Sequence, residues 1–170
     1  IPDELLGAVS KASQFGQGFA TAEYVAASII DLAWHSLSPE EAAKLESTPE
    51  AIADFEQDAL DAAGMDIDAI APRYRSTYFQ HIFAGGYSAG YYSYLWAEAL
   101  DADGFEWFRE ENAATPDDDS ASAEVSDETA RKAGQRFRDL ILSTGASRDF
   151  SEVYSQLRGR DKDLTPLLVR

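Results

Sequence analysis

The amino-acid sequence predicts an all-α protein. Helix-start signals recur along the chain, apolar residues follow them at helical spacing, and no two segments alternate as paired strands would. The chain has 170 residues, of which 45% are hydrophobic, so it can bury a real core. Its length favours one helical domain, or a fragment of one, over residues 1–170.

The first two helices are predicted from a proline start and a glycine break. Pro2 suits the first helical turn, and Asp3 and Glu4 suit the positive end of the helix dipole. The Gly-Gln-Gly sequence at 16–18 ends this helix, and a second one is expected over 21–37. Its apolar stripe comprises Val25, Ile29, Leu32 and Ala33.

Two further helix starts follow. Ser38 and Glu41 fit a capping box with Pro39 at the first helical position. Thr48 and Pro49 repeat this signal, and Gly64 ends the helix that follows. The buried face of that helix is expected to hold Ile52, Phe55 and Leu60.

The second half of the chain contains the densest aromatic segment, residues 78–96. It predicts a helix over 87–103, preceded by a loop, and a short helix over 105–108. Residues 111–126 are predicted to be a mobile acidic surface loop. Helices are then expected over 127–142, with Ala130, Phe137, Leu140 and Ile141 inward, and over 149–157. Leu164, Leu167 and Leu168 form an apolar tail expected to dock on the body.

The charge excludes several classes of partner. With 14 Lys and Arg against 31 Asp and Glu, the formal net charge is -17. Nucleic acids and anionic lipid surfaces attract basic proteins, so neither is an expected partner. No apolar run is long enough for a transmembrane helix, and no signal peptide begins the chain. The absence of cysteine fits a cytoplasmic protein, with the periplasm as the alternative.

Metal and nucleophile chemistry find little support in the sequence itself. His35 and His81 belong to no H-E-x-x-H motif, so this chain alone is expected to bind no catalytic zinc. No G-x-S-x-G motif is present. His35 lies on an apolar helix and is interpreted as a core histidine with its polar atoms satisfied.

The tyrosines of the central segment are the strongest candidates for chemistry. Tyr87, Tyr91 and Tyr94 are spaced four and three apart, which places three phenols on one helix face. One interpretation is a packed aromatic stripe. The other is a set of O–H donors lining a cleft, with His81 at its mouth, because a phenol can stabilise an oxyanion.

Glycines and arginines flank these tyrosines. Gly85 and Gly86 form a flexible hinge and allow close approach by a backbone or a ligand. Arg73 and Arg75 can bind a carboxylate, either the substrate's or one of this chain's own in a structural salt bridge.

Three stretches resemble the thimet-oligopeptidase family of zinc metallopeptidases. They are ASQFGQGFATAEYVAASIIDLAWHSL (12–37), PRYRSTYFQHIFAGGYSAGYYSYLWAEAL (72–100) and GQRFRDLILSTGASRDFSEVYSQLRGRDKDLTPLL (134–168). Nearly the whole chain is covered, apart from the acidic segment near 111–126. The first two stretches look closer to bacterial peptidyl-dipeptidase than to oligopeptidase A.

The resemblance implies a fold and a cofactor. Family members have two mainly helical lobes around a deep channel that admits short peptides, and this chain looks like a C-terminal part of the catalytic lobe. Their zinc ligands lie N-terminal to the part matched here. The resemblance therefore implies a zinc peptidase as the full-length parent, with this chain inactive alone and its partner the missing zinc-binding part of the same enzyme.

The same resemblance assigns roles to the central residues. It implies that Tyr87 and Tyr94 contact substrate, with Tyr94 stabilising the oxyanion, and that Tyr91 supports the same wall. His81 would hydrogen-bond to the substrate or transition state, and the Gly85–Gly86 hinge would let the loop close over a peptide. Capture of the peptide's C-terminal carboxylate by Arg73 or Arg75 is our own addition.

Two alternatives stay open. The chain could be a non-catalytic helical interaction module that uses the family's fold, or one piece of a cleaved enzyme whose parts remain associated. As an isolated fragment it would expose apolar surface that the zinc-binding part normally covers, and self-association is then expected.

Overall fold

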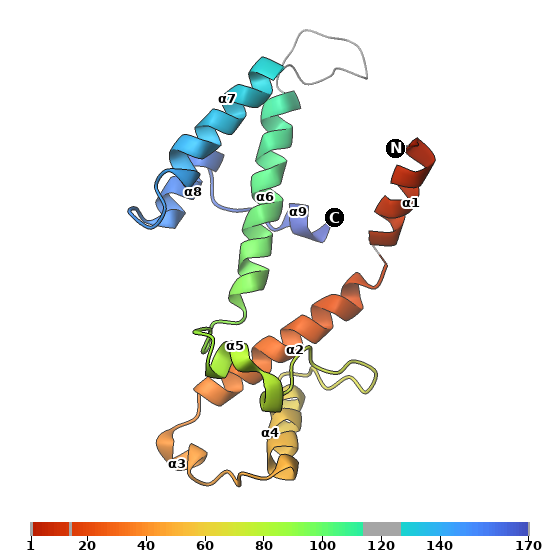
Figure 1. The fold of residues 1–170 in the computed structure, drawn as a ribbon, viewed down its shortest axis with the longest axis vertical. Helices are drawn as coiled ribbons and strands as arrows, with labels where there is room; N and C mark the ends of the chain where they lie inside the picture. The colour runs from red at the N-terminus through yellow and green to blue at the C-terminus, as the bar shows by residue number, and fades with distance from the viewer. Residues whose placement is uncertain (1, 14, 114–126, 170) are drawn as a thin grey trace. The chain divides into compact units, whose positions relative to one another are not determined.

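The computed structural model describes residues 2–13, 15–113 and 127–169, and every regular element in these ranges is a helix (Figure 1). This confirms the predicted all-α class. The chain divides into two compact units, Ile1–Tyr94 and Leu95–Arg170. The expectation of one helical domain or fragment over 1–170 stays a prediction. The two units are groups of residues that contact one another, and such a grouping does not test whether they form one domain.

The first unit is built around one long helix. Its elements are α1 (Asp3–Ser13), α2 (Gln17–His35), α3 (Pro39–Ala42), α4 (Pro49–Ala62), the 3-10 turn η1 (Ser76–Tyr78) and α5 (Gln80–Phe83). Local signals start two of the helices. Ser38 and Glu41 form the predicted capping box at α3, and the Thr48 side chain accepts from the backbone N–H of Ala51 at α4.

Helix α2 contributes to two apolar clusters. Ala26 and Ile30 pack with Leu60 of α4, while Ala27 packs with Phe79, Ile82 and Tyr91. Trp34 touches both clusters. The residues from 74 to 94 are therefore held against α2 by burial of aromatic surface, which is the main driving force available to such segments.

The second unit contains α6 (Ser93–Ala113) from Leu95 onward, α7 (Asp127–Phe137), the π-helical turn η2 (Arg138–Leu142), α8 (Phe150–Arg158) and α9 (Thr165–Leu168). Its core is Trp107, Ala133 and Leu157. Phe137, Leu140 and Ile141 pack against this core, as predicted. Ala130 is exposed instead, and Ala133 takes the inward position one turn later.

Four further expectations about the second half are wrong. Helix α6 begins at Ser93, not near residue 87, and it continues through 105–108 rather than breaking into a separate short helix. It also includes 111–113, so the predicted acidic loop does not begin at 111; residues 114–126 lie outside the described ranges. Leu168 is 80% exposed, which contradicts docking of the whole apolar tail.

None of the helices in the ranges described is long and apolar enough to cross a membrane.

Candidate functional site

The candidate site is an aromatic cluster in the first unit. Tyr91 lies at its centre and is only 4% exposed. Its ring centroid lies 4.8 Å from that of Phe79, 5.1 Å from that of Tyr24 and 5.3 Å from that of Tyr94. Burial raises the pKa of Tyr91 to about 12, an effect that the positive charge of Arg73 partly opposes. Tyr91 is thus a neutral, packed phenol.

Tyr87 and Tyr94 form the accessible face of this cluster. Their side chains are 39% and 43% exposed, and their rings stack with centroids 5.4 Å apart and planes inclined by 14°. A hydrogen bond between the two phenols, together with burial, raises the pKa of Tyr94. Tyr94 is therefore a protonated phenol at ordinary pH, and a phenol O–H can donate a hydrogen bond.

The prediction that one helix carries all three phenols on one face is wrong, because two of the three tyrosines are not in a helix. Tyr87 and Tyr91 precede α6, in an irregular segment that we call the tyrosine loop (residues 87–92). The loop still brings Tyr87, Tyr91 and Tyr94 into one cluster, but it divides them: Tyr91 points into the core, while Tyr87 and Tyr94 are exposed.

His81 of α5 lies beside the tyrosines. Its ring centroid is 4.8 Å from that of Tyr74, 5.6 Å from that of Tyr91 and 6.2 Å from that of Tyr87. The Nδ1 atom is buried and has no hydrogen-bond partner within the described part of the chain. A buried ring nitrogen without a partner is costly unless something binds to it, so this atom can accept or donate a hydrogen bond to a further group.

A buried carboxylate on α2 holds the tyrosine loop. Asp31 is fully buried, and its two oxygens accept the backbone N–H of Ala89 at 2.9 Å and of Tyr91 at 2.8 Å. From the same helix, the Tyr24 hydroxyl donates to the Tyr91 carbonyl. Ser88 donates its hydroxyl to the Ile82 carbonyl at 2.6 Å, which ties the loop to α5.

The two predicted hinge glycines differ in what requires them. A Cβ on Gly85 would lie 2.9 Å from the His81 carbonyl oxygen and 3.0 Å from its Cα, so this glycine permits a close backbone approach. Gly86 has a φ of +82°, in the left-handed region that side chains disfavour. Their motion as a hinge stays a prediction.

The two candidate arginines have different surroundings. Arg75 Nε pairs with Glu56, a buried carboxylate of α4 that also accepts the backbone N–H of Ser76. This is the structural salt bridge that the sequence left as an alternative. Arg73 has an exposed side chain, and its charge acts on the Tyr91 phenol.

A metal site is not formed by the residues present. Within residues 2–13, 15–113 and 127–169, no group of three or more His, Asp or Glu side chains could hold a metal ion. The Nδ1 atom of His35 lies 2.8 Å from an Asp31 oxygen, on the side of α2 that faces the tyrosine loop. The donor set of the residues described therefore does not fit the catalytic zinc that the resemblance implies for the parent enzyme.

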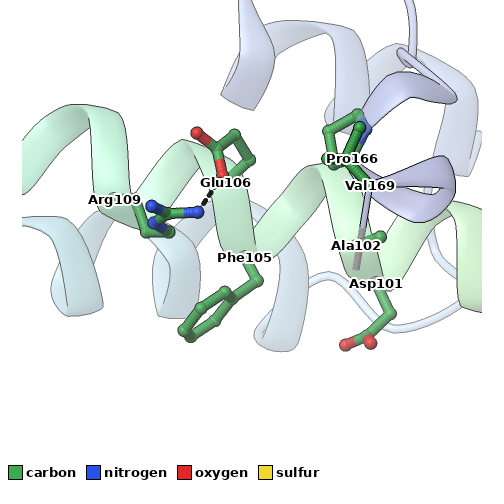
Figure 2. A pocket seen from close by; sticks show the side chains of 7 residues that line it. All are labelled: Asp101, Ala102, Phe105, Glu106, Arg109, Pro166 and Val169. Atoms are coloured by element: carbon green, nitrogen blue, oxygen red, sulfur yellow. Dashed lines mark hydrogen bonds and ion pairs between the residues drawn. The ribbon is translucent and has the colours of Figure 1, made fainter. Parts of the chain in front are cut away.

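A pocket in the second unit holds none of the predicted site residues. It has a volume of about 450 Å³ and is lined by Asp101, Ala102, Phe105, Glu106, Arg109, Pro166 and Val169. Figure 2 shows Pro166 and Val169 at one end of it, with the ion pair of Glu106 and Arg109 at the other.

Sequence reasoning missed two buried carboxylates of the first unit, Asp31 and Glu56. Each stands on the apolar stripe of its helix: Asp31 is four residues after Ala27, and Glu56 is four residues before Leu60. An acid in such a stripe needs hydrogen-bond donors from another part of the chain. An acidic residue within an apolar stripe can be recognised in the sequence, but the sequence does not show which residues donate hydrogen bonds to it.

Comparison of the sequence with known proteins identifies its family. The sequence model of peptidase family M3 matches residues 1–170. The dipeptidyl carboxypeptidases of Salmonella typhimurium and Escherichia coli are 41% and 42% identical to the chain over 169 and 168 residues. These matches cover 99% of the chain and 22% of each relative, so the chain spans about a fifth of their length.

Oligopeptidase A of Escherichia coli is 43% identical over 90 residues, which is 53% of the chain and 11% of that relative. The greater extent of the dipeptidyl carboxypeptidase match confirms the expected order of resemblance. A family model that matches the whole chain, with relatives above 40% identity along nearly all of it, leaves one assignment. The chain belongs to peptidase family M3.

Proposed function

We propose that this chain supplies the substrate-binding and oxyanion-stabilising side chains of a zinc-dependent peptidase that hydrolyses short peptides. The observation that carries the proposal is the pair of stacked, exposed phenols of Tyr87 and Tyr94, beside a His81 ring whose Nδ1 has no partner in the described residues. Two exposed phenols and the His81 ring thus lie close together, in a stretch that the family model covers.

The chemistry proposed for these groups is hydrogen bonding to the developing charge. When a water attacks a peptide carbonyl, negative charge grows on the carbonyl oxygen. A phenol O–H that is already in place stabilises this charge without losing its proton. The hydrogen bond to Tyr87 and burial raise the pKa of Tyr94, so its phenol stays protonated. To act on a substrate, the Tyr94 O–H would exchange the Tyr87 oxygen for the carbonyl oxygen. His81 would hydrogen-bond to the same substrate.

Zinc enters this proposal only as a group held elsewhere. The residues described here do not form its site. We therefore place the zinc ligands in another part of the enzyme, in line with the 22% of each dipeptidyl carboxypeptidase that the chain matches. The chain alone is then inactive, and its first partner is that zinc-binding part.

Arg73 is the proposed anchor for the C-terminal carboxylate of a peptide. Release of a dipeptide from that end requires recognition of a free carboxylate, and an exposed guanidinium can bind one through two hydrogen bonds. Arg73 is exposed and close enough to affect the Tyr91 phenol, whereas Arg75 already pairs with Glu56. Arg75 is therefore the weaker of the two candidates.

The experiment has a genetic part and a biochemical part. An in-frame H-E-x-x-H upstream of Ile1 in the encoding gene supports the proposal, and a start codon next to Ile1 contradicts it and favours the non-catalytic interaction module. The longer product should cleave a short peptide and lose this activity on chelation. The 170-residue chain should cleave no peptide. Chelator-sensitive turnover by this chain would overturn the proposal that the zinc ligands lie in another part of the enzyme.

The anchor role of Arg73 has its own test in the longer protein. Arg73→Ala should raise KM for a peptide with a free C-terminus and leave KM unchanged for the same peptide with an amidated C-terminus. Arg148→Ala, at another exposed arginine, is the matched control and should change neither value. An equal effect of Arg73→Ala on both peptides would remove Arg73 from this role.

Self-association of the isolated chain follows from the same proposal. Several large apolar side chains are strongly exposed: Leu5, Val9, Phe15, Phe105, Leu142, Leu168 and Val169. We propose that the missing zinc-binding part covers some of these side chains, because contiguous exposed apolar surface marks interaction sites. Sedimentation should show concentration-dependent association of the chain, and a monomer at high concentration would contradict it.

A further inference from the structure

We propose that Asp31 is the positioning residue of the tyrosine loop: from α2, its carboxylate holds the backbone conformation that places Tyr87 beside Tyr94. The inference rests on the proposed function, because the loop matters for chemistry only if these two phenols do. It also goes beyond that function, since Asp31 touches neither phenol ring and would act through the backbone alone.

The contacts of Asp31 lead directly into the loop. Its Oδ1 accepts the N–H of Ala89 and its Oδ2 accepts the N–H of Tyr91, at 2.9 and 2.8 Å. One carboxylate thus binds two amides two residues apart in a segment that is neither helix nor strand. Such charge-assisted hydrogen bonds to buried amides are among the stronger polar interactions in proteins.

The conformation that these bonds hold is an unfavourable one. Ala89 has a φ of +53°, and it is the one non-glycine residue with a positive φ within the described ranges. A side chain disfavours this left-handed conformation, so it persists only where the surroundings impose it. The Asp31 contact to the Ala89 N–H supplies that constraint.

A carboxylate suits this position better than the side chains nearest to it in shape. Asparagine offers one acceptor oxygen, and its NH2 group would face a second N–H donor. A leucine would leave the buried Tyr91 amide and the partly buried Ala89 amide without this partner. Asp31 is 0% exposed, and besides the two amides its carboxylate has the His35 ring as a neighbour, whose Nδ1 lies 2.8 Å from Oδ1 and 2.8 Å from the Asp31 carbonyl oxygen.

The experiment compares two isosteric changes at buried carboxylates of the same unit. Asp31→Asn removes one acceptor from the loop, while Glu56→Gln weakens the pair with Arg75 and Ser76 and leaves the Asp31 contacts intact. Both changes should lower stability, because each acts on a buried carboxylate. They should differ in what they do to the loop, which NMR of the 170-residue chain can report.

In Asp31→Asn we expect the amide protons of Ala89 and Tyr91 to exchange about tenfold faster or more, since each loses a bond to a charged acceptor. The contact between the Tyr87 and Tyr94 rings should weaken, and the pKa of Tyr91 should fall from about 12 towards 10.0. Glu56→Gln should leave all three readouts as in the wild type. Equal changes in both variants, or none in Asp31→Asn, would overturn the proposal.

A second variant keeps the test decisive if Asp31→Asn does not fold. Ala89→Gly removes the penalty of the left-handed conformation, so adding it to Asp31→Asn should restore folding and part of the Tyr87–Tyr94 contact. A residue that served only the packing of α2 would gain nothing from a change in the loop. A double variant that remains unfolded, or recovers no contact, would therefore count against the positioning role.

The loop readouts need neither zinc nor substrate, so they separate this inference from the proposed function. In the longer enzyme, Asp31→Asn should lower kcat more than it raises KM. If Tyr94→Phe leaves kcat unchanged, the proposed function fails. The NMR experiment on Asp31 does not depend on that result, because it measures only the conformation of the tyrosine loop.

Discussion

The Tyr87 and Tyr94 rings stack with their centroids 5.4 Å apart, although α6 begins at Ser93 and only Tyr94 lies within it. The stack therefore depends on how the tyrosine loop approaches the first turn of the helix. Tyr91, between them in sequence, turns inward and is buried. The loop thus separates one packing phenol from two exposed ones.

Tyr94→Phe in the longer enzyme should lower kcat by about 10²–10³-fold, the usual loss when one oxyanion donor is removed. The stability of the protein should change little, because the ring and its stacking are kept. Tyr92→Phe is the matched control: Tyr92 is two residues away and 51% exposed, and no role is assigned to it. A kcat that changes equally in both variants would remove Tyr94 from the proposed role.

Gly85→Ala should destabilise the first unit by about 1–3 kcal/mol, the typical cost of forcing an added methyl into a packed place. The new Cβ would meet the His81 carbonyl oxygen at 2.9 Å, so the His81 backbone must shift. Urea unfolding measures the stability, and the NMR signals of the His81 ring report the shift.

The matched control for this change is Gly104→Ala in α6. A Cβ at Gly104 meets nothing within 4 Å, and alanine should stabilise the helix by up to about 1 kcal/mol. If Gly85→Ala were as stable as the wild type, with unchanged His81 signals, the close approach would not be the reason for glycine there.

Burial of Tyr91 predicts a loss of stability at alkaline pH. Its pKa is about 12 in the folded chain against 10.0 when unperturbed, so between these values the unfolded chain loses a proton that the folded chain keeps. The free energy of unfolding should therefore be unaffected by this group below pH 10.0 and fall from there towards pH 12. In Tyr91→Phe, the free energy of unfolding should fall less steeply with pH across this range than in the wild type. An unchanged slope would contradict the raised pKa of Tyr91.

Arg158→Met should destabilise the second unit by about 3–5 kcal/mol, because it leaves the fully buried Asp103 carboxylate without one of its two arginine partners. The Arg158 side chain is 1% exposed and pairs with Asp103 at 2.8 Å and Glu110 at 2.6 Å. Burial opposes ionisation of Asp103, but hydrogen bonds from Tyr154, Arg160 and Arg158 outweigh it and lower its pKa.

Arg109→Met is the control for this variant. Its side chain is 68% exposed and pairs with Glu106 at 3.0 Å, so its loss should cost less than about 1 kcal/mol. Urea unfolding of both variants checks the difference. Similar losses would mean that the Arg158 network contributes no more than a surface ion pair.

Local chemistry made several elements predictable from the sequence. The Ser38–Glu41 capping box, the Thr48 cap and the Gly64 break act within a few residues, so their effect can be read without knowledge of the fold. The all-α class and the family resemblance are likewise carried by the order of residues along the chain. The tyrosines, His81 and the arginines could be singled out as candidates for the same reason.

The tertiary structure alone decided how these candidates are arranged. Helical spacing predicted Tyr87, Tyr91 and Tyr94 on one helix face. In the structure, Asp31, about 60 residues earlier, accepts hydrogen bonds from the loop amides, and the helix begins only at Ser93. Glu56 likewise takes Arg75 into a structural pair, which leaves Arg73 as the exposed guanidinium. Partners so distant in sequence leave no periodic signal, because their contact exists only once α2, α4 and the tyrosine loop have packed.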